Sequence, residues 1–246
     1  MLKVFIITPL LLLSCSQASA TWYFQPEVGY EILTYEVTIG ESIDSPPSAT
    51  IPRIIAGATL MHSSGWYLDA KTTGGDGEIE SFFPDIDYIE RSDTTISTGI
   101  GSRDGFILFI GINQSTTTIE NRKQQANQSS TFEFTSDGYF IGLAKNILIS
   151  YNHTLAFSAA LAKMEGSYNS LHDSNPDLIY EAEGDATGLT ASASYTYRIL
   201  PRAALTLGIK IQSYLYTEMF DTTSQEQFSD TNEALTNTYM KVSYTF

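Results

Sequence analysis

The chain has 246 residues, of which 28 are acidic and 13 are basic, and its formal net charge is −15. Such an excess of negative charge repels nucleic-acid phosphates, so we exclude nucleic-acid binding. The sequence contains one cysteine, Cys15, and this rules out an intramolecular disulfide framework.

The first residues have the pattern of an export signal. A short basic start precedes an apolar run at 4–13, and Ala-Ser-Ala at 18–20 is a small-residue cleavage site. The run is shorter than the ~20 residues of a membrane-spanning helix. The residues before Cys15 also fit a lipoprotein processing site, so lipidation at Cys15 is the alternative to cleavage after Ala20. We predict a signal peptide over 1–20 and a single domain over 21–246.

We predict five strands in the first half of the chain, and most of these segments alternate apolar and polar residues with a period of two, as strands with one apolar face do. They lie at 22–38, 53–61, 66–73, 95–101 and 106–114. In the first, Val28, Tyr30 and Ile32 alternate with Glu27, Gly29 and Glu31. The fifth is apolar on both faces, so the pattern leaves its register open.

Five more segments follow in the second half, at 137–146, 154–164, 186–198, 205–214 and 235–246. The fourth of these alternates most clearly. Leu205, Leu207, Ile209 and Ile211 fall on one face, and Thr206, Gly208, Lys210, Gln212 and Tyr214 fall on the other. We predict that the apolar face contacts lipid and that the polar face points inward.

The connections between these segments sort into two length classes. Short turns are expected at 62–65, 101–105, 150–153 and 199–202, and long acidic or polar loops at 40–52, 74–94, 115–136, 165–185 and 218–233. Short turns at one end and long loops at the other are typical of transmembrane barrels, whereas a soluble sandwich has no reason to sort its connections in this way. We therefore predict an all-β, antiparallel, up-and-down transmembrane barrel of about ten strands, with eight to twelve as the range. An even count places both termini at the short-turn, periplasmic end.

The last segment ends in an aromatic residue. Met240, Val242, Tyr244 and Phe246 share one face, alternating with Lys241, Ser243 and Thr245. This pattern resembles the closing strand of Gram-negative outer-membrane β-barrels. The resemblance implies an outer-membrane location in contact with lipid and lipopolysaccharide. It also implies that these four residues are the signal that the outer-membrane assembly machinery reads.

Several charged residues fall on the predicted inward faces: Glu27, Glu31, Arg53, Asp69, Lys71, Arg198, Lys210 and Lys241. They either line a path for ions or solutes, or pair with one another and fill the barrel. Barrels of about eight strands are filled by side chains, and open channels appear near sixteen. We therefore predict a filled interior, with Tyr67, Tyr214 and Tyr239 adding bulk.

Two groups at the loop end offer a catalytic alternative. Asp85 and Asp87 lie in one predicted loop, and His172 with Asp173 lies in another. The arrangement is similar to the omptins, ten-stranded outer-membrane proteases with an aspartate pair opposite an aspartate–histidine dyad. The resemblance implies that His172 acts as a general base on water. The order differs, since Asp173 follows His172 and Ser170 stands where the family has its aspartate.

The sequence thus predicts an integral outer-membrane protein that is not an enzyme. It either presents acidic extracellular loops to an unidentified ligand or forms a narrow pore, and the alternative is an omptin-like surface protease. No spacing matches a calcium loop, and we expect neither a metal nor a cofactor.

Overall fold

The computed structural model describes residues 21–39, 48–80, 86–120, 130–172, 180–221 and 230–246. The predicted signal peptide, Asp85 and Asp173 lie outside this part of the chain. The described residues contain no helix long and apolar enough to span a membrane.

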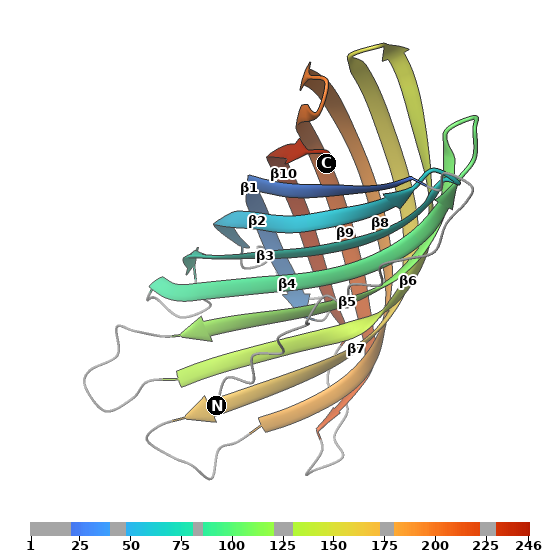
Figure 1. Cartoon of the computed structure of the whole chain (residues 1–246). Helices are drawn as coiled ribbons and strands as arrows, with labels where there is room; N and C mark the ends of the chain where they lie inside the picture. The colour runs from blue at the N-terminus through green and yellow to red at the C-terminus, as the bar shows by residue number, and fades with distance from the viewer. Residues whose placement is uncertain (1–20, 40–47, 81–85, 121–129, 173–179, 222–229) are drawn as a thin grey trace.

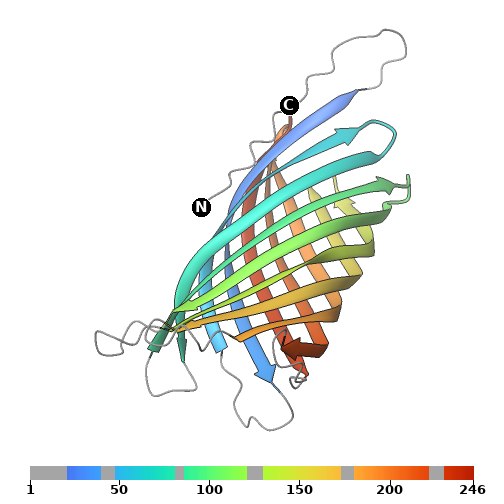
Figure 2. The same cartoon turned by 90° about the horizontal axis from the view of Figure 1, so that it is seen from below.

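Ten antiparallel strands form one closed barrel in which each strand pairs with its neighbours in sequence, and β1 pairs with β10 (Figure 1). The strands are β1 (Trp22–Ile39), β2 (Ser48–His62), β3 (Trp66–Glu80), β4 (Ile86–Gly101), β5 (Phe106–Glu120), β6 (Ser130–Ser150), β7 (His153–His172), β8 (Tyr180–Leu200), β9 (Ala203–Asp221) and β10 (Thr231–Tyr244). The strands are strongly tilted, as closure of a sheet requires (Figure 2). The predicted fold class and strand number are confirmed.

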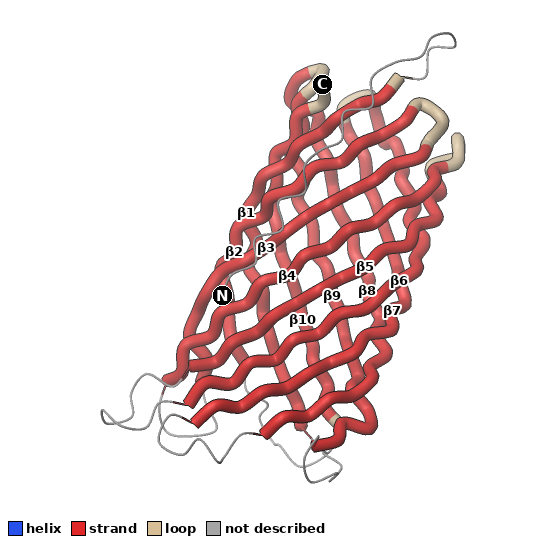
Figure 3. The backbone as a smooth tube through the Cα atoms, turned by 60° about the horizontal axis from the view of Figure 1, so that its bottom comes forward, coloured by secondary structure: helices blue, strands red, loops and turns tan. Residues whose placement is uncertain are grey.

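The four short turns lie together at one end of the barrel, where the chain also ends (Figure 3). Two of them depend on glycine, since Gly65 and Gly105 have φ values of 93° and 81°, which a residue with a Cβ adopts only with strain. The Gly65 N–H donates to His62 O at 2.9 Å, closing the β2–β3 turn. This end is called the short-turn end below.

Apolar side chains cover the outside of the barrel next to the short-turn end. We call this surface the apolar belt. Every strand contributes to it, with exposed fractions of 39% to 64% for one representative of each: Val28, Ile54, Leu68, Ile100, Ile110, Leu143, Leu161, Leu189, Ile209 and Met240. A band of exposed aliphatic groups around a closed sheet is what a hydrocarbon environment requires.

Beyond the belt the alternation reverses. There the outward side chains are acidic and the inward ones apolar. We call the outward carboxylates the acidic collar: Glu36, Asp76, Glu78, Glu90, Glu133, Asp137, Glu165, Glu181, Glu183 and Asp185. Behind them, Leu33, Ile51 and Ile89 are 0% exposed. The strands therefore extend past the belt as a small water-facing barrel with an apolar core of its own.

This reversal corrects the predicted loops, which are shorter than expected. Most of the predicted loop at 74–94 is strand, because β3 continues to Glu80 and β4 begins at Ile86. The same holds at the other four connections, where the described strands extend into the ranges 40–52, 115–136, 165–185 and 218–233. These segments were predicted as loops because their outward residues are acidic. Their inward residues are nevertheless packed inside the barrel, as those of strands are. The acidic groups of the collar thus lie on strands.

The structure also fixes the register of β5, which the sequence left open. Phe106, Leu108, Ile110 and Ile112 are 49% to 58% exposed and belong to the belt. Phe109 points inward, and its ring centroid lies 6.1 Å from that of Phe140.

Candidate functional site

The lumen is crossed by ion pairs where the belt gives way to the collar. Arg91 on β4 reaches Glu233 on β10, with Nη1 and Oε1 2.5 Å apart. These strands are separated by β3, β2 and β1 along the sheet, so the contact spans the interior. The two side chains are 2% and 1% exposed, so little water screens the attraction between them.

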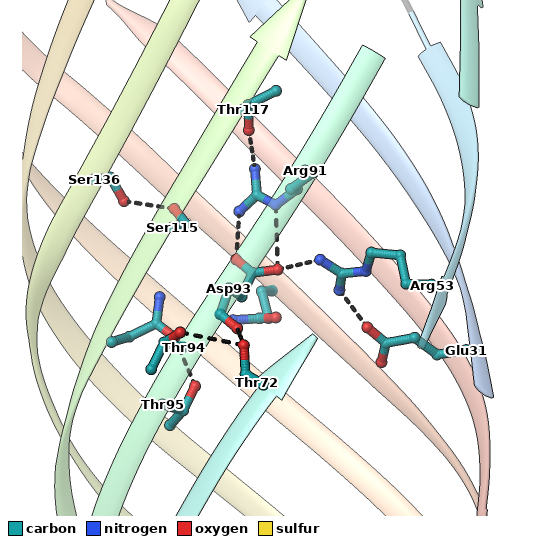
Figure 4. Close-up of polar contacts among 12 residues, drawn as sticks. Glu31, Arg53, Thr72, Arg91, Asp93, Thr94, Thr95, Ser115, Thr117 and Ser136 are labelled. Carbon is teal, nitrogen blue, oxygen red and sulfur yellow. Dashed lines mark hydrogen bonds and ion pairs between the residues drawn. The ribbon is translucent and has the colours of Figure 1, made fainter. Parts of the chain in front are cut away.

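Asp93 joins this pair to a second arginine (Figure 4). The Arg91 Nη2 donates to Asp93 Oδ1 at 3.1 Å, and the Arg53 Nη1 donates to Asp93 Oδ2. Arg53 Nη2 in turn lies 2.5 Å from Glu31 Oε1. This last contact is close enough for an ion pair, but Glu31 Oε1 is not aligned as a hydrogen-bond acceptor.

The five groups form one chain of alternating charge across the lumen, which we call the ionic layer: Glu31, Arg53, Asp93, Arg91 and Glu233. Thr117 accepts a further hydrogen bond from Arg91 Nη1 at 2.9 Å. Lys210 lies near enough to interact electrostatically with Asp93, which offsets the excess negative charge of the five. Buried charges require this pairing, because an unpaired one carries a large desolvation cost.

An apolar core fills the lumen inside the collar. Its buried members come from β1–β4 and β7–β10: Leu33, Tyr35, Ala49, Ile51, Ile79, Ile89, Met164, Ala182, Ala186, Tyr214, Tyr216 and Leu235. Phe134 on β6 meets Tyr216 on β9 edge to face at 5.0 Å, although two strands lie between them along the sheet. The core therefore draws on most of the barrel wall, and it shares β1, β2, β4 and β10 with the ionic layer.

Glycines on the inner wall provide space for the aromatic rings. A Cβ at Gly188 would overlap the ring of Tyr214, and one at Gly208 would overlap the ring of Tyr239. The rings therefore lie flat against neighbouring strands, and this arrangement lets a narrow barrel hold several tyrosines inside.

A second polar group lies closer to the short-turn end. Lys241 Nζ is 2.7 Å from Glu27 Oε2, joining β10 to β1, and Thr59 donates to Asp69 Oδ1 at 2.6 Å. Lys71 and Lys210 are also inside, close enough to each other to repel. Among the predicted lumen charges, the structure therefore brings together Glu27 with Lys241 and, separately, Glu31 with Arg53.

Arg198 lies at the rim of the barrel, away from the other predicted lumen charges. It is exposed at the short-turn end, and its guanidinium lies over the ring of Tyr151 at 5.1 Å from the centroid. Arg198 pairs with Ala204 in the regular register and so keeps the inward parity that the sequence predicts, but it lies at the end of the lumen, where its side chain is exposed.

Three members of the ionic layer were not identified from the sequence: Arg91, Asp93 and Glu233. All three fall in segments that were predicted as loops. The sequence does contain a signal, because Ile89, Arg91 and Asp93 alternate with exposed Glu90 and Ser92. The pattern predicts a strand only if the apolar side of a strand is allowed to face inward, which is the reverse of the arrangement in the belt.

The proposed catalytic groups are only partly within the described structure. Asp87 lies near the start of β4 and His172 is the last residue of β7, so both backbones lie at the end away from the short turns. Asp85 and Asp173 lie outside the described residues, as do the side chains of Asp87 and His172. The catalytic assignment stays a prediction.

The residues of the proposed assembly signal face outward at the barrel seam. Met240, Val242, Tyr244 and Phe246 are 41% to 65% exposed. The Phe246 N–H donates to Phe24 O at 2.9 Å, and the two rings are 6.3 Å apart. The chain end is thereby held against β1.

Comparison with solved structures identifies the fold. The barrel is similar to the outer membrane protease OmpT from Escherichia coli, with a TM-score of 0.64 and 12% identity over 94% of this chain and 99% of that one. It is also similar to the translocator domain of autotransporter NalP from Neisseria meningitidis, with a TM-score of 0.51 and 9% identity over 91% of this chain and 88% of that one. No family model and no curated protein matches the sequence. The chain therefore has the fold of the Gram-negative outer-membrane β-barrels.

Proposed function

We propose that the chain is an integral protein of the Gram-negative outer membrane, with a barrel closed to ion flow and an acidic collar presented outside the cell. Both termini then lie in the periplasm, and lipopolysaccharide and phospholipid surround the belt. The outer-membrane assembly machinery reads the closing strand. The observation that carries the proposal is the filled lumen, in which the Arg91–Glu233 pair and the apolar core cross from one wall to the other.

Closure favours surface interaction over transport. A conducting barrel needs a continuous wet path, whereas Leu33, Ile51, Ile89 and Tyr216 are 0% exposed at one level of this lumen. Single-channel recording in a planar bilayer tests this, with a known porin reconstituted in the same way as the positive control. We expect no discrete current steps from this protein. Stable, reproducible steps would instead support the narrow pore.

The proposed orientation, with the collar outside the cell, is supported by the short turns at the other end, because such turns are typically periplasmic in outer-membrane barrels. Glu183 is exposed on the collar, and Ser102 is exposed in a short turn. We expect a membrane-impermeant maleimide to label Glu183→Cys on intact cells, and to label Ser102→Cys only after the outer membrane is permeabilised. Labelling of Ser102→Cys on intact cells would reverse the orientation.

The partner of such a collar is basic, by charge complementarity. A fluorescent polylysine peptide serves as the probe on cells or on purified protein. We expect binding that weakens with salt and that falls in the triple variant Glu181→Gln, Glu183→Gln, Asp185→Asn. The single neutralisation Asp104→Asn at the short-turn end is the control and should bind as the wild type does. Equal binding by the triple variant would rule out the collar as the contact surface.

An omptin-like protease is the second candidate. It is favoured by the similarity to OmpT and by the position of Asp87 and His172 at the same end of the barrel. Purified protein in lipopolysaccharide should then cleave members of a peptide library, and His172→Ala should abolish the cleavage. No cleavage by the wild type eliminates this candidate.

A further inference from the structure

The short-turn end of the barrel is not level around its rim. β6 continues to Ser150, past Lys145, which pairs with Phe106, the first residue of β5. On the far side of β7, β8 continues to Leu200. The N–H of Arg198 donates to the carbonyl of Asn152 at 2.8 Å, so the β6–β7 and β8–β9 turns are joined. Together they form a lip that extends past β5.

The lip is apolar and exposed. Its apolar members are between 43% and 74% exposed: Ile147, Leu148, Ile149, Tyr151, Ile199 and Leu200. The strand pairing shifts between Leu148 and Ser150 and again between Arg198 and Leu200. Leu148 still pairs with Thr154 in the regular register, so it has inward parity, whereas Ile147 continues the outward face of Leu143. Leu148 and Ile149 are both exposed because β6 here has passed the end of β5. An apolar patch of this kind requires an occupant, because water solvates it poorly.

Cations surround the lip in an otherwise acidic protein. Arg198 and Arg202 are exposed at its turns, and Arg103 and Lys145 lie on the adjoining rim. Neither Arg198 nor Arg202 forms an ion pair with any carboxylate of the described residues. Asp104 is the only acidic side chain exposed at this end within the described ranges. The carboxylates of the collar lie at the opposite end, so the charge of the chain is strongly polarised.

We propose that the lip binds an anionic phospholipid of the leaflet at the short-turn end. Its acyl chains lie along Ile147, Ile149 and Ile199, in continuity with the apolar belt. Its phosphate lies against the guanidinium groups of Arg198 and Arg202, and Tyr151 holds Arg198 in place through the ring contact. Amphipathic aromatic and basic residues favour this interfacial position. The inference rests on the membrane location proposed above.

The occupant is a lipid and not a second protein for two reasons. On β6 the outward face runs from Leu143 through Lys145 to Ile147, and the Lys145 ammonium lies over the Phe106 ring at 3.9 Å from its centroid. The apolar surface of the belt therefore continues into the lip around this one cation. The cations stand at its edge, at the depth where phosphates lie when the apolar residues are in the acyl region. A docked protein or a second copy of the chain is the outcome that the experiment below distinguishes.

Tryptophan quenching by brominated lipids tests the proposal in the full chain. The two native tryptophans are first replaced, Trp22→Phe and Trp66→Phe, and a single reporter is introduced as Ile147→Trp, on the outward face of β6. The protein is placed in mixed vesicles of phosphatidylcholine and phosphatidylglycerol, with bromine on one lipid at a time. We expect quenching at this position, with a relative association constant that favours brominated phosphatidylglycerol.

The matched control reporter is Leu143→Trp, on the same face of the same strand. We expect it to be quenched equally by both lipids, because mid-belt contacts do not distinguish headgroups. At Ile147→Trp, the added change Arg198→Gln should lower the preference for phosphatidylglycerol about fivefold, the effect of one cation at an anionic surface. Arg202→Gln should do the same. Lys163→Gln, which removes a cation near the collar, should leave the preference unchanged.

Three outcomes would overturn the proposal. Equal quenching of Ile147→Trp by the two lipids would show that the lip does not select an anionic headgroup. Quenching by acrylamide and not by bromine would show that water and not lipid reaches the lip. The occupant would then be a protein partner or a second copy of the chain. If Leu143→Trp also escapes bromine, the membrane location itself fails, so the two proposals are tested separately.

Discussion

Arg91 on β4 and Glu233 on β10 meet across the lumen at 2.5 Å, although three strands lie between them along the sheet. Their sequence positions differ by 142. The contact exists only when β1 and β10 have closed the barrel, so the pair reports on closure.

Removing one partner of this pair should destabilise the protein strongly. We expect Arg91→Ala to lower the free energy of unfolding by about 3–5 kcal/mol, because it leaves Glu233 buried without its cation. Urea unfolding in detergent micelles, followed by far-UV circular dichroism, measures the change. The double variant Arg91→Met, Glu233→Leu should lose less than the single one. A double variant that is less stable than Arg91→Ala would contradict this account.

The two isoleucines Ile51 and Ile54 on β2 should respond differently to truncation. Ile51 is 0% exposed inside the collar, and Ile54 is 59% exposed on the belt. Ile51→Ala should cost about 2–5 kcal/mol because it leaves a cavity in the apolar core. Ile54→Ala should cost clearly less, since detergent or lipid fills the space. Equal losses in urea unfolding would mean that the collar has no packed core.

An arginine on the outer face of β9 should destabilise the barrel within the belt but be tolerated beyond it. Leu207 and Leu215 lie on the same face of β9 and are 46% and 43% exposed. We expect Leu207→Arg to destabilise the barrel by about 2–4 kcal/mol in lipid vesicles, and Leu215→Arg by about 0–1 kcal/mol, because only Leu207 lies at the depth of the acyl chains. A similar effect at both sites would place the membrane boundary elsewhere.

Packing of tyrosines against glycines makes a further prediction. The variant Gly188→Ala should cost about 1–3 kcal/mol, because the new methyl group overlaps the Tyr214 ring. Adding Tyr214→Leu should recover part of the loss. The control is Gly74→Ala, where the nearest atom to the added Cβ is Ser92 Cβ at 3.9 Å. A loss at Gly74→Ala as large as that at Gly188→Ala would indicate a general need for glycine in place of ring packing.

The sequence by itself determined the number of strands, their order and, except for β5, the face that each turns outward within the belt. This was possible because an up-and-down barrel pairs only neighbours in sequence, and because lipid on one side and polar side chains on the other give a period of two. Leu205, Leu207, Ile209 and Ile211 carry this information without any partner, so local reading was sufficient.

Only the tertiary structure decided what lies above the belt and inside it. Around Glu78 and Glu90 water replaces lipid outside, so the outward residues become acidic and the strands take on the composition of loops. The ionic layer depends on Arg91, Asp93 and Glu233, which become neighbours through closure and strand tilt. Those are properties of the whole sheet, and no local stretch of sequence encodes them.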